Sequence, residues 1–152
     1  MHGVELVVLA THSSATIGTA RALGVAIGDT PVLCVASDLT FTDAGVLPGR
    51  DSHSLAEELA GVIAAPVAAG LHSVSAVDLV GSELLDEDAL VCGDDPRAKE
   101  LSLELAAKLV SGRAVDVGPL ANSRALEAMT AVILNVNRRF RVHAGLRFTG
   151  LP

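Results

Sequence analysis

The stretch VELVVLATHSSA, residues 4–15, decides the fold class of this 152-residue chain. Its first part, residues 4–10, is a short, continuous run of apolar and β-branched residues, which is typical of a buried strand. The polar residues Thr11, His12, Ser13 and Ser14 end this run and include good helix caps, and residues 15–27 continue as a helical segment. A buried strand that leads directly into a helix indicates an α/β protein.

The same alternation of strands and helices continues along the chain. Further buried strands are expected at residues 32–36, 66–71, 89–92 and 113–117. Helices are expected at residues 53–63, 96–110 and 122–142, a short helix or turn at 76–85, and a long loop at 37–52. This order predicts one α/β domain over residues 1–152, with three layers, a mostly parallel sheet and a long C-terminal helix.

Local signals mark where two of these helices begin. Ser52 or Ser54 is a natural cap for the helix at 53–63. Asp95 and Pro96 form a natural cap and first residue for the helix at 96–110. The segment Gly93-Asp94-Asp95-Pro96 could hold a cation through its carboxylates, but a turn followed by a helix cap explains it, and we prefer that interpretation.

Composition excludes several classes of protein. Half of the residues are hydrophobic, 19% are charged and the net charge is −7, which argues against a nucleic-acid partner. No apolar run reaches the roughly 18–20 residues of a membrane-spanning helix. Cys34 and Cys92 lie in expected buried strands, so free core thiols are the preferred interpretation. The N-terminus has no signal-peptide layout, and we expect a cytoplasmic location.

Ligands of parallel sheets bind where the strands end. If all strands are parallel, one edge of the sheet carries Thr11-His12-Ser13, Ser37-Asp38, His72-Ser73-Val74-Ser75, Gly93-Asp94-Asp95 and Gly118-Pro119. The sequence contains no G-x-G-x-x-G phosphate turn, no paired metal ligands at the usual spacings and no nucleophile elbow. We therefore expect no catalytic nucleophile or base and no metal site.

Three other features carry further interpretations, and two of them allow two each. His72 is either a ligand contact or a loop histidine that is hydrogen-bonded to the backbone. Arg124 and Glu127 are spaced for an ion pair along a helix. The basic segment at residues 135–147 either attracts an anionic ligand or complements the dipole at a helix end.

Long motifs carry a resemblance to a known family. The segments LVCGDDPRAK (90–99), DVGPLANSRALEAMTAVILNVNRR (116–139) and HAGLRFTG (143–150) resemble the C-terminal part of F420-dependent NADP oxidoreductases. The segments GLHSVSA (70–76) and VVLATHSSA (7–15) resemble parts of the same family. The resemblance implies a truncated Rossmann-like domain that corresponds to the C-terminal two-thirds of such an enzyme.

The resemblance also implies site residues and a cofactor. In this family a hydride passes between NADP and the deazaflavin coenzyme F420, while the protein orients the two rings. Thr11 and His12 stand where the family has an apolar-Pro-aromatic turn near the nicotinamide. By position, the residues near the deazaflavin are His72, Ser73, Val74, Arg124, Ala128 and Ala144.

One part of the family pattern has no counterpart in residues 1–152. This part comprises the first strand, its Gly-rich turn, the second strand and the basic loop that holds the NADP phosphates. The resemblance therefore implies F420 binding without the usual NADP phosphate site. The expected function is that of an F420-dependent NADP oxidoreductase-like protein, which either needs a partner chain or is inactive alone. The alternative is a non-catalytic module that binds F420 or a partner protein.

We also expect a homodimer or a heteromer. Without a first strand, one edge of the sheet is open, and open edges invite association. The long helix at 122–142 carries more apolar residues than one buried face requires, namely Leu126, Met129, Val132, Ile133 and Val136.

Overall fold

The computed structural model describes residues 3–81 and 83–151. Its strands are β1 (Val7–Leu9), β2 (Val32–Cys34), β3 (Leu39–Thr42), β4 (Gly45–Pro48), β5 (Val67–Gly70), β6 (Ala89–Gly93) and β7 (Ala114–Asp116). Its helices are α1 (Ser13–Ile27), α2 (Leu55–Ala60), α3 (Pro96–Ala107) and α4 (Ser123–Phe140), with short 3₁₀ helices η1 (Asp78–Val80) and η2 (Leu120–Asn122). The predicted elements are thus present, mostly shortened at their ends.

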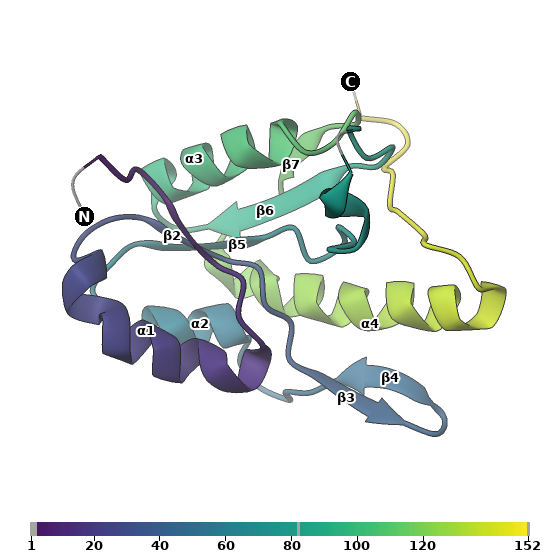
Figure 1. Ribbon diagram of the computed structural model, residues 1–152, viewed down its shortest axis with the longest axis horizontal. Coiled ribbons are helices and arrows are strands. Elements are labelled where there is room, and N and C mark those ends of the chain that lie inside the picture. Colours follow the sequence, from purple (N-terminus) through teal and green to yellow (C-terminus); the bar gives the residue numbers. More distant parts are fainter. Residues whose placement is uncertain (1–2, 82, 152) are drawn as a thin grey trace.

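The elements form three layers. The middle layer is a five-stranded sheet in the order β1-β2-β5-β6-β7. Helices α1, α2 and α4 cover one face of this sheet, and α3 alone covers the other face (Figure 1). The predicted α/β class, the mostly parallel sheet and the long C-terminal helix are confirmed.

Local capping explains where two helices begin. Ser54 begins α2 with a capping box, in which its side chain accepts from the backbone N–H of Glu57 and the carboxylate of Glu57 accepts from the backbone N–H of Ser54. Asp95 begins α3, because its Oδ1 accepts from the backbone N–H of Ala98 at 2.8 Å, and Pro96 follows as the first helical residue. The interpretation of residues 93–96 as a turn followed by a helix cap is therefore confirmed.

The direction of β6 differs from the prediction. Strands β1, β2 and β5 are parallel, whereas β6 is antiparallel to β5, and β7 is parallel to β6. Among the described residues between β5 and β6, η1 is the only helix, and it is too short for the crossover helix that a parallel pair requires. The prediction that all strand ends share one edge is therefore wrong, since residues 93–95 and 118–119 lie at the edge opposite to Thr11, Ser37 and His72.

A β-hairpin occupies the segment that was expected to be a long loop. Strands β3 and β4 pair in antiparallel fashion within residues 37–52, beside α4 (Figure 1). The side-chain amide of Asn135 on α4 accepts from the N–H of Val46 at 2.9 Å and donates to its C=O at 2.8 Å. Gly45 has a φ of 142°, and a Cβ there would lie 2.6 Å from Asn135 Oδ1, so this close approach requires glycine.

Two apolar clusters fill the spaces between the layers. One cluster includes Leu9, Leu55 and Leu59 and lies between the sheet and α1, α2 and α4, while the other includes Leu33 and Val91 and lies beneath α3. Free thiols at the buried positions Cys34 and Cys92 are confirmed, and burial raises their pKa values to about 11 and about 12. None of the helices in the described part of the chain is long and apolar enough to cross a membrane.

Candidate functional site at the carboxyl ends of three strands

A pocket of about 360 Å³ opens where β1 and β2 end. This volume lies within the range of small-molecule sites, roughly 300–1,000 Å³. The hairpin forms one wall of the pocket with two apolar side chains. The lining residues are Thr11, His12, Ser13, Ala36, Ser37, Leu39 and Phe41.

The turn between β1 and α1, which lines this pocket, is fixed by hydrogen bonds at the start of α1. His12 caps the helix, and its Nδ1 accepts from the N–H of Ser14 at 3.4 Å. The hydroxyls of Thr11 and Thr16 lie 3.0 Å apart in a second hydrogen bond. These contacts hold the turn in place, while the ring of His12 remains exposed at the pocket.

His72 lies at the end of β5, behind the wall that Ala36 and Ser37 form. Leu71 precedes it with a φ of 62°, an uncommon conformation for a branched residue, which turns the chain sharply after the strand. The residue is only 7% exposed, yet neither ring nitrogen has a hydrogen-bond partner among the described residues. The hydroxyl of Ser73 is likewise buried without a partner there. Unpartnered buried polar groups of this kind are rare and require an explanation.

Burial also sets the charge of the His72 ring. Removal from water lowers its pKa from 6.5 to about 4, and the nearby backbone of Ala36 offsets this effect only in part. The ring is therefore neutral at pH 7. A neutral imidazole offers one hydrogen-bond donor and one acceptor, so it suits a ligand with both kinds of group.

Thr130 on α4 connects the pocket to His72. Its hydroxyl donates to the backbone C=O of His72 at 2.9 Å and lies 2.9 Å from the hydroxyl of Ser37. The ends of β2 and β5 are therefore joined through one side chain of the long helix. Sequence reasoning missed Thr130, although it lies only two residues after the predicted contact Ala128.

A second buried group on α4, Glu127, was also missed. It is 3% exposed, and its Oε1 accepts from the N–H of Leu55 at 2.7 Å, so it anchors α4 to the start of α2. Burial raises its pKa to about 7, although backbone N–H groups and the charge of Arg50 oppose the shift. The predicted ion pair between Arg124 and Glu127 is absent from the described residues, because Glu127 points inward and Arg124 is exposed.

A smaller pocket of about 170 Å³ lies near the start of β6, at the same edge of the sheet. The segment after α4 closes it, and this segment is held by Asp88, whose carboxylate accepts from the N–H groups of Arg113 and Phe148 at 2.8 Å each. The Arg113 guanidinium and these N–H groups hold the pKa of Asp88 well below its usual range. The lining residues are Ser75, Asp78, Leu85, Asp86, Glu87, His143, Ala144 and Gly145.

The eight predicted site residues fall into four groups. Thr11 and His12 line the larger pocket, and Ala144 lines the smaller one. Val74 follows the buried pair His72 and Ser73 and packs against the apolar cluster beneath α3. The remaining two, Ala128 and Arg124, lie on α4 before Thr130.

Arg124 is the predicted residue that lies farthest along α4 from His72. It is in the first turn of the helix, about 9 Å of helix rise before Thr130. The helix starts just after η2, where the N–H of Leu120 donates to Asp94 Oδ1 at 3.0 Å, near the opposite edge of the sheet. The structure thus brings Thr11, His12 and His72 to one edge and places Arg124 toward the other.

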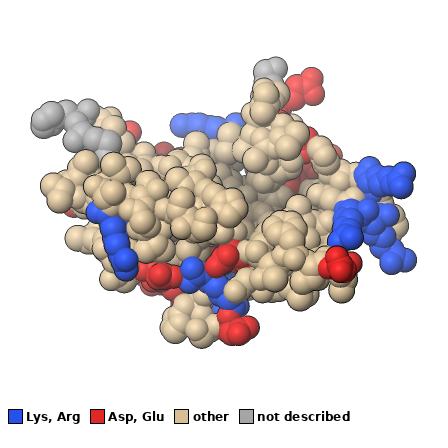
Figure 2. Space-filling model, turned by 60° about the horizontal axis from the view of Figure 1, so that its bottom comes forward, with Lys and Arg blue, Asp and Glu red and all other residues tan. Residues whose placement is uncertain are grey.

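The basic segment at residues 135–147 is only partly available to an anionic ligand. Arg147 pairs with Asp86, and the exposed Arg138 and Arg139 lie in the last turn of α4, where cations complement the helix dipole. Figure 2 shows basic side chains gathered at this end of the molecule.

Comparisons with known proteins link this geometry to a group of enzymes. No protein-family model matches the chain. The F420-dependent NADP reductase of Methanothermobacter thermautotrophicus is 43% identical over 88 residues, which is 57% of this chain and 38% of the relative. Its counterpart in Methanothermobacter marburgensis is 39% identical over 90 residues, 57% of this chain and 39% of the relative. The predicted resemblance is confirmed. The match spans about two fifths of the length of these relatives.

Solved structures show the same fold. A protein of Arthrobacter sp. FB24, described as a candidate F420-dependent NADP reductase, superimposes with a TM-score of 0.84 and 22% identity over 97% of this chain and 70% of its own. A hypothetical protein of Sinorhizobium meliloti gives a TM-score of 0.60 and 21% identity over 78% of this chain and 59% of its own. At these identities the likeness concerns the fold alone.

Proposed function

We propose that the chain binds the deazaflavin coenzyme F420 at the carboxyl ends of β1, β2 and β5 and takes part in hydride transfer between F420 and NADP. The observation that carries this proposal is the buried, unpartnered His72 behind the 360 Å³ pocket. The names of the relatives that match 57% of the chain supply the coenzyme and the type of reaction.

The residues at this edge fit a flat, polar ring. Among the described residues, neither ring nitrogen of His72 nor the hydroxyl of Ser73 has a partner at hydrogen-bond geometry, although the backbone of Ala36 lies close to the ring. A flat ring with donors and acceptors on its edge would satisfy these groups. Leu39 and Phe41 from the hairpin provide apolar surface on one side of the pocket. Bound F420 supplies the hydride-carrying carbon.

The protein's own task would be orientation. His72 is neutral at pH 7 and holds no proton to donate from a charged state, so it positions the ring through hydrogen bonds. Thr130 fixes the backbone of His72 against Ser37, and Asn135 fixes the hairpin that bears Phe41. Helix α4 thus holds both the backbone of His72 and the hairpin that forms the pocket wall.

The test is a fluorescence titration of F420 against the wild-type chain and two histidine variants. We expect His72→Ala to weaken binding at least tenfold, since the ring loses its buried polar partner. His53→Ala is the matched control, because His53 is exposed before α2 and lies outside the proposed site; its affinity should equal that of the wild type. Equal affinities for all three proteins, or no fluorescence change on adding F420, would refute the proposal.

A second candidate function is a non-catalytic F420-binding or partner-binding module. It is favoured by the turn after β1, Thr11-His12-Ser13, which lacks the glycines that cradle dinucleotide phosphates. A separate titration with NADPH, and an assay for oxidation of reduced F420 by NADP, distinguish the two functions. The module binds F420 without turnover.

We further propose that the chain assembles through α4, as a homodimer or a heteromer. Val132 and Val136 are exposed on this helix, whereas Leu126 is buried within the chain. Light scattering would test this proposal, which a strictly monomeric chain would contradict.

A further inference from the structure

A further pocket lies at the tip of the β3–β4 hairpin, beside the last turns of α4. This hairpin-tip pocket has a volume of about 460 Å³. The charged groups in its lining are two guanidinium groups and one carboxylate, so the lining is positive in a chain whose formal net charge is −7. The lining residues are Asp43, Ala44, Gly45, Asn135, Arg138 and Arg139.

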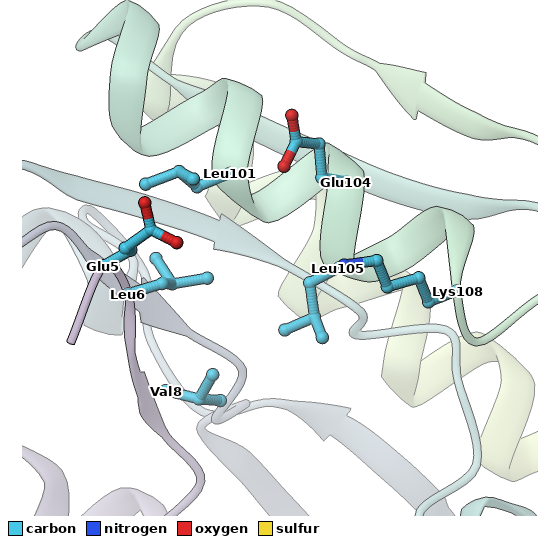
Figure 3. Close-up of a pocket in the computed structure, with 7 residues that line it drawn as sticks. All are labelled: Glu5, Leu6, Val8, Leu101, Glu104, Leu105 and Lys108. Atoms are coloured by element: carbon cyan, nitrogen blue, oxygen red, sulfur yellow. The ribbon is translucent and has the colours of Figure 1, made fainter. Parts of the chain in front are cut away.

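The groove between β1 and α3, on the other face of the sheet, has the opposite charge. Its volume is about 320 Å³, and Figure 3 shows Glu5, Glu104 and Lys108 together with the apolar side chains that line it. Two carboxylates and one ammonium group do not attract an anion. The hairpin-tip pocket, with two guanidinium groups and one carboxylate, does attract one.

The two arginines of the hairpin-tip pocket have donors to spare. Arg138 Nη1 donates to the C=O of Thr42 at 3.4 Å, which uses one of the five N–H groups of this guanidinium. The guanidinium of Arg139 lies over the ring of Phe140, with its Cζ 5.8 Å from the ring centre. Within the described part of the chain, neither arginine is in an ion pair. Both can therefore bind an oxyanion.

The helix dipole alone does not explain where these charges lie. Cations at the end of α4 complement the dipole, but side chains on a helix lean toward its N-terminus. Arg138 accordingly reaches back to Thr42 in the hairpin. The hairpin is itself held by Asn135, whose amide bonds both the N–H and the C=O of Val46. The wall of the pocket is therefore formed before any ligand binds.

The hairpin-tip pocket follows the proposed coenzyme pocket along both the hairpin and α4. Phe41 lines the coenzyme pocket and Asp43 lines the tip, a separation of roughly 7 Å along an extended chain. On α4, Arg138 lies about 12 Å of helix rise beyond Thr130. A ligand whose ring lies beside Phe41 and Thr130 therefore needs an extended tail to reach the arginines.

We infer that the hairpin-tip pocket binds the extended acidic tail of a ligand, with phosphate and carboxylate oxygens on Arg138 and Arg139. The inference rests on the proposed function for the identity of that ligand, because coenzyme F420 carries a ribityl chain, a phosphate ester and γ-linked glutamates on its ring. Guanidinium groups bind such oxygens in a bidentate manner. Asp43 in the same pocket repels the anion and limits its affinity.

The test compares F420 with the deazaflavin that lacks phosphate and glutamates, by fluorescence titration at low ionic strength. We expect the wild type to bind F420 more tightly than this tail-less compound. The double variant Arg138→Gln/Arg139→Gln should weaken F420 binding about fivefold, because two exposed ionic contacts are lost, and should leave the tail-less compound unaffected. Asp43→Asn should strengthen F420 binding about twofold.

The matched control is Arg97→Gln/Lys108→Gln, which removes the same amount of charge from exposed positions on α3. It should change neither affinity. Equal F420 affinities for the wild type, the arginine variant and this control would overturn the inference and leave the proposed function standing. A loss of affinity for the tail-less compound in the arginine variant would also overturn it, because that compound has no tail to bind.

A second measurement needs no deazaflavin ring. The dipeptide γ-glutamylglutamate is titrated into the isotopically labelled chain, and the NMR signals of Gly45 and the Asn135 side chain are followed. We expect both signals to shift in the wild type and to stay unchanged in the arginine variant. These shifts without affinity for either deazaflavin would refute the proposed function alone. Neither shifts nor affinity would refute both.

Discussion

Two buried ionisable side chains, Glu127 on α4 and His72 packed against the same helix, differ in what surrounds them. Glu127 lies at the junction of α2 and α4 and has a short hydrogen bond from Leu55. His72 lies against the middle of α4, held only through its backbone, and its ring has no partner among the described residues. Because a fold is stabilised by hydrogen-bonded buried groups, Glu127 serves the structure, and we propose that His72 contacts the ligand of the proposed function.

The largest expected effect is a loss of stability at Glu127, whose buried carboxylate is hydrogen-bonded. Glu127→Ala should lower the free energy of unfolding by about 3 kcal/mol, because the buried N–H of Leu55 loses its acceptor and a cavity remains. Glu127→Gln is the control, since its amide oxygen can still accept, and it should cost about 1 kcal/mol. Urea denaturation measures both values. Equal losses in the two variants would show that the hydrogen bond to Leu55 contributes little.

The pH dependence of stability should separate the two groups. Burial raises the pKa of Glu127 from 4.5 to about 7, so between these values the unfolded chain loses a proton that the folded chain keeps, and stability falls as pH rises. Burial lowers the pKa of His72 from 6.5 to about 4, so the unfolded chain gains a proton first and stability falls as pH falls. Each effect is at most about 3 kcal/mol.

In the wild type, the contributions of Glu127 and His72 to the pH dependence of stability oppose each other between about pH 4.5 and pH 6.5. Relative to the wild type, Glu127→Gln should therefore gain stability with rising pH, and His72→Leu should lose it. Chemical denaturation at several pH values tests this. Parallel profiles for the three proteins would mean that neither group is as strongly perturbed as its burial implies.

The smallest expected effect on stability is at His72. His72→Leu should keep the unfolding free energy at pH 7 within about 1 kcal/mol of the wild type, because an apolar side chain of similar size replaces a buried polar ring that makes no hydrogen bond within the described part of the chain. The same variant should lose F420 affinity. A large loss of stability would instead show that the ring has a structural partner and would remove the contrast with Glu127.

Sequence reasoning located the strands and helices but not the geometry of the site. Asp95 with Pro96, and Ser54, cap helices through residues only three positions away, so a local pattern suffices to find them. Glu127 and Leu55 are 72 residues apart, and Thr130 and His72 are 58 apart. Nothing local signals such contacts, which is why Glu127 was interpreted as a partner of Arg124 and Thr130 was overlooked.

The sequence by itself determined the alternation of buried strands and helices, the two free cysteines, the position of His72 after a strand and the resemblance to F420-dependent reductases, because these depend on neighbouring residues or on continuous motifs. Only the tertiary structure decided that β6 runs against β5, that residues 37–52 form a hairpin held by Asn135, and that the ring of His72 is buried with no hydrogen-bond partner among residues 3–81 and 83–151. Strand direction and burial depend on which distant segments pack together, and that packing is settled only when the whole chain folds.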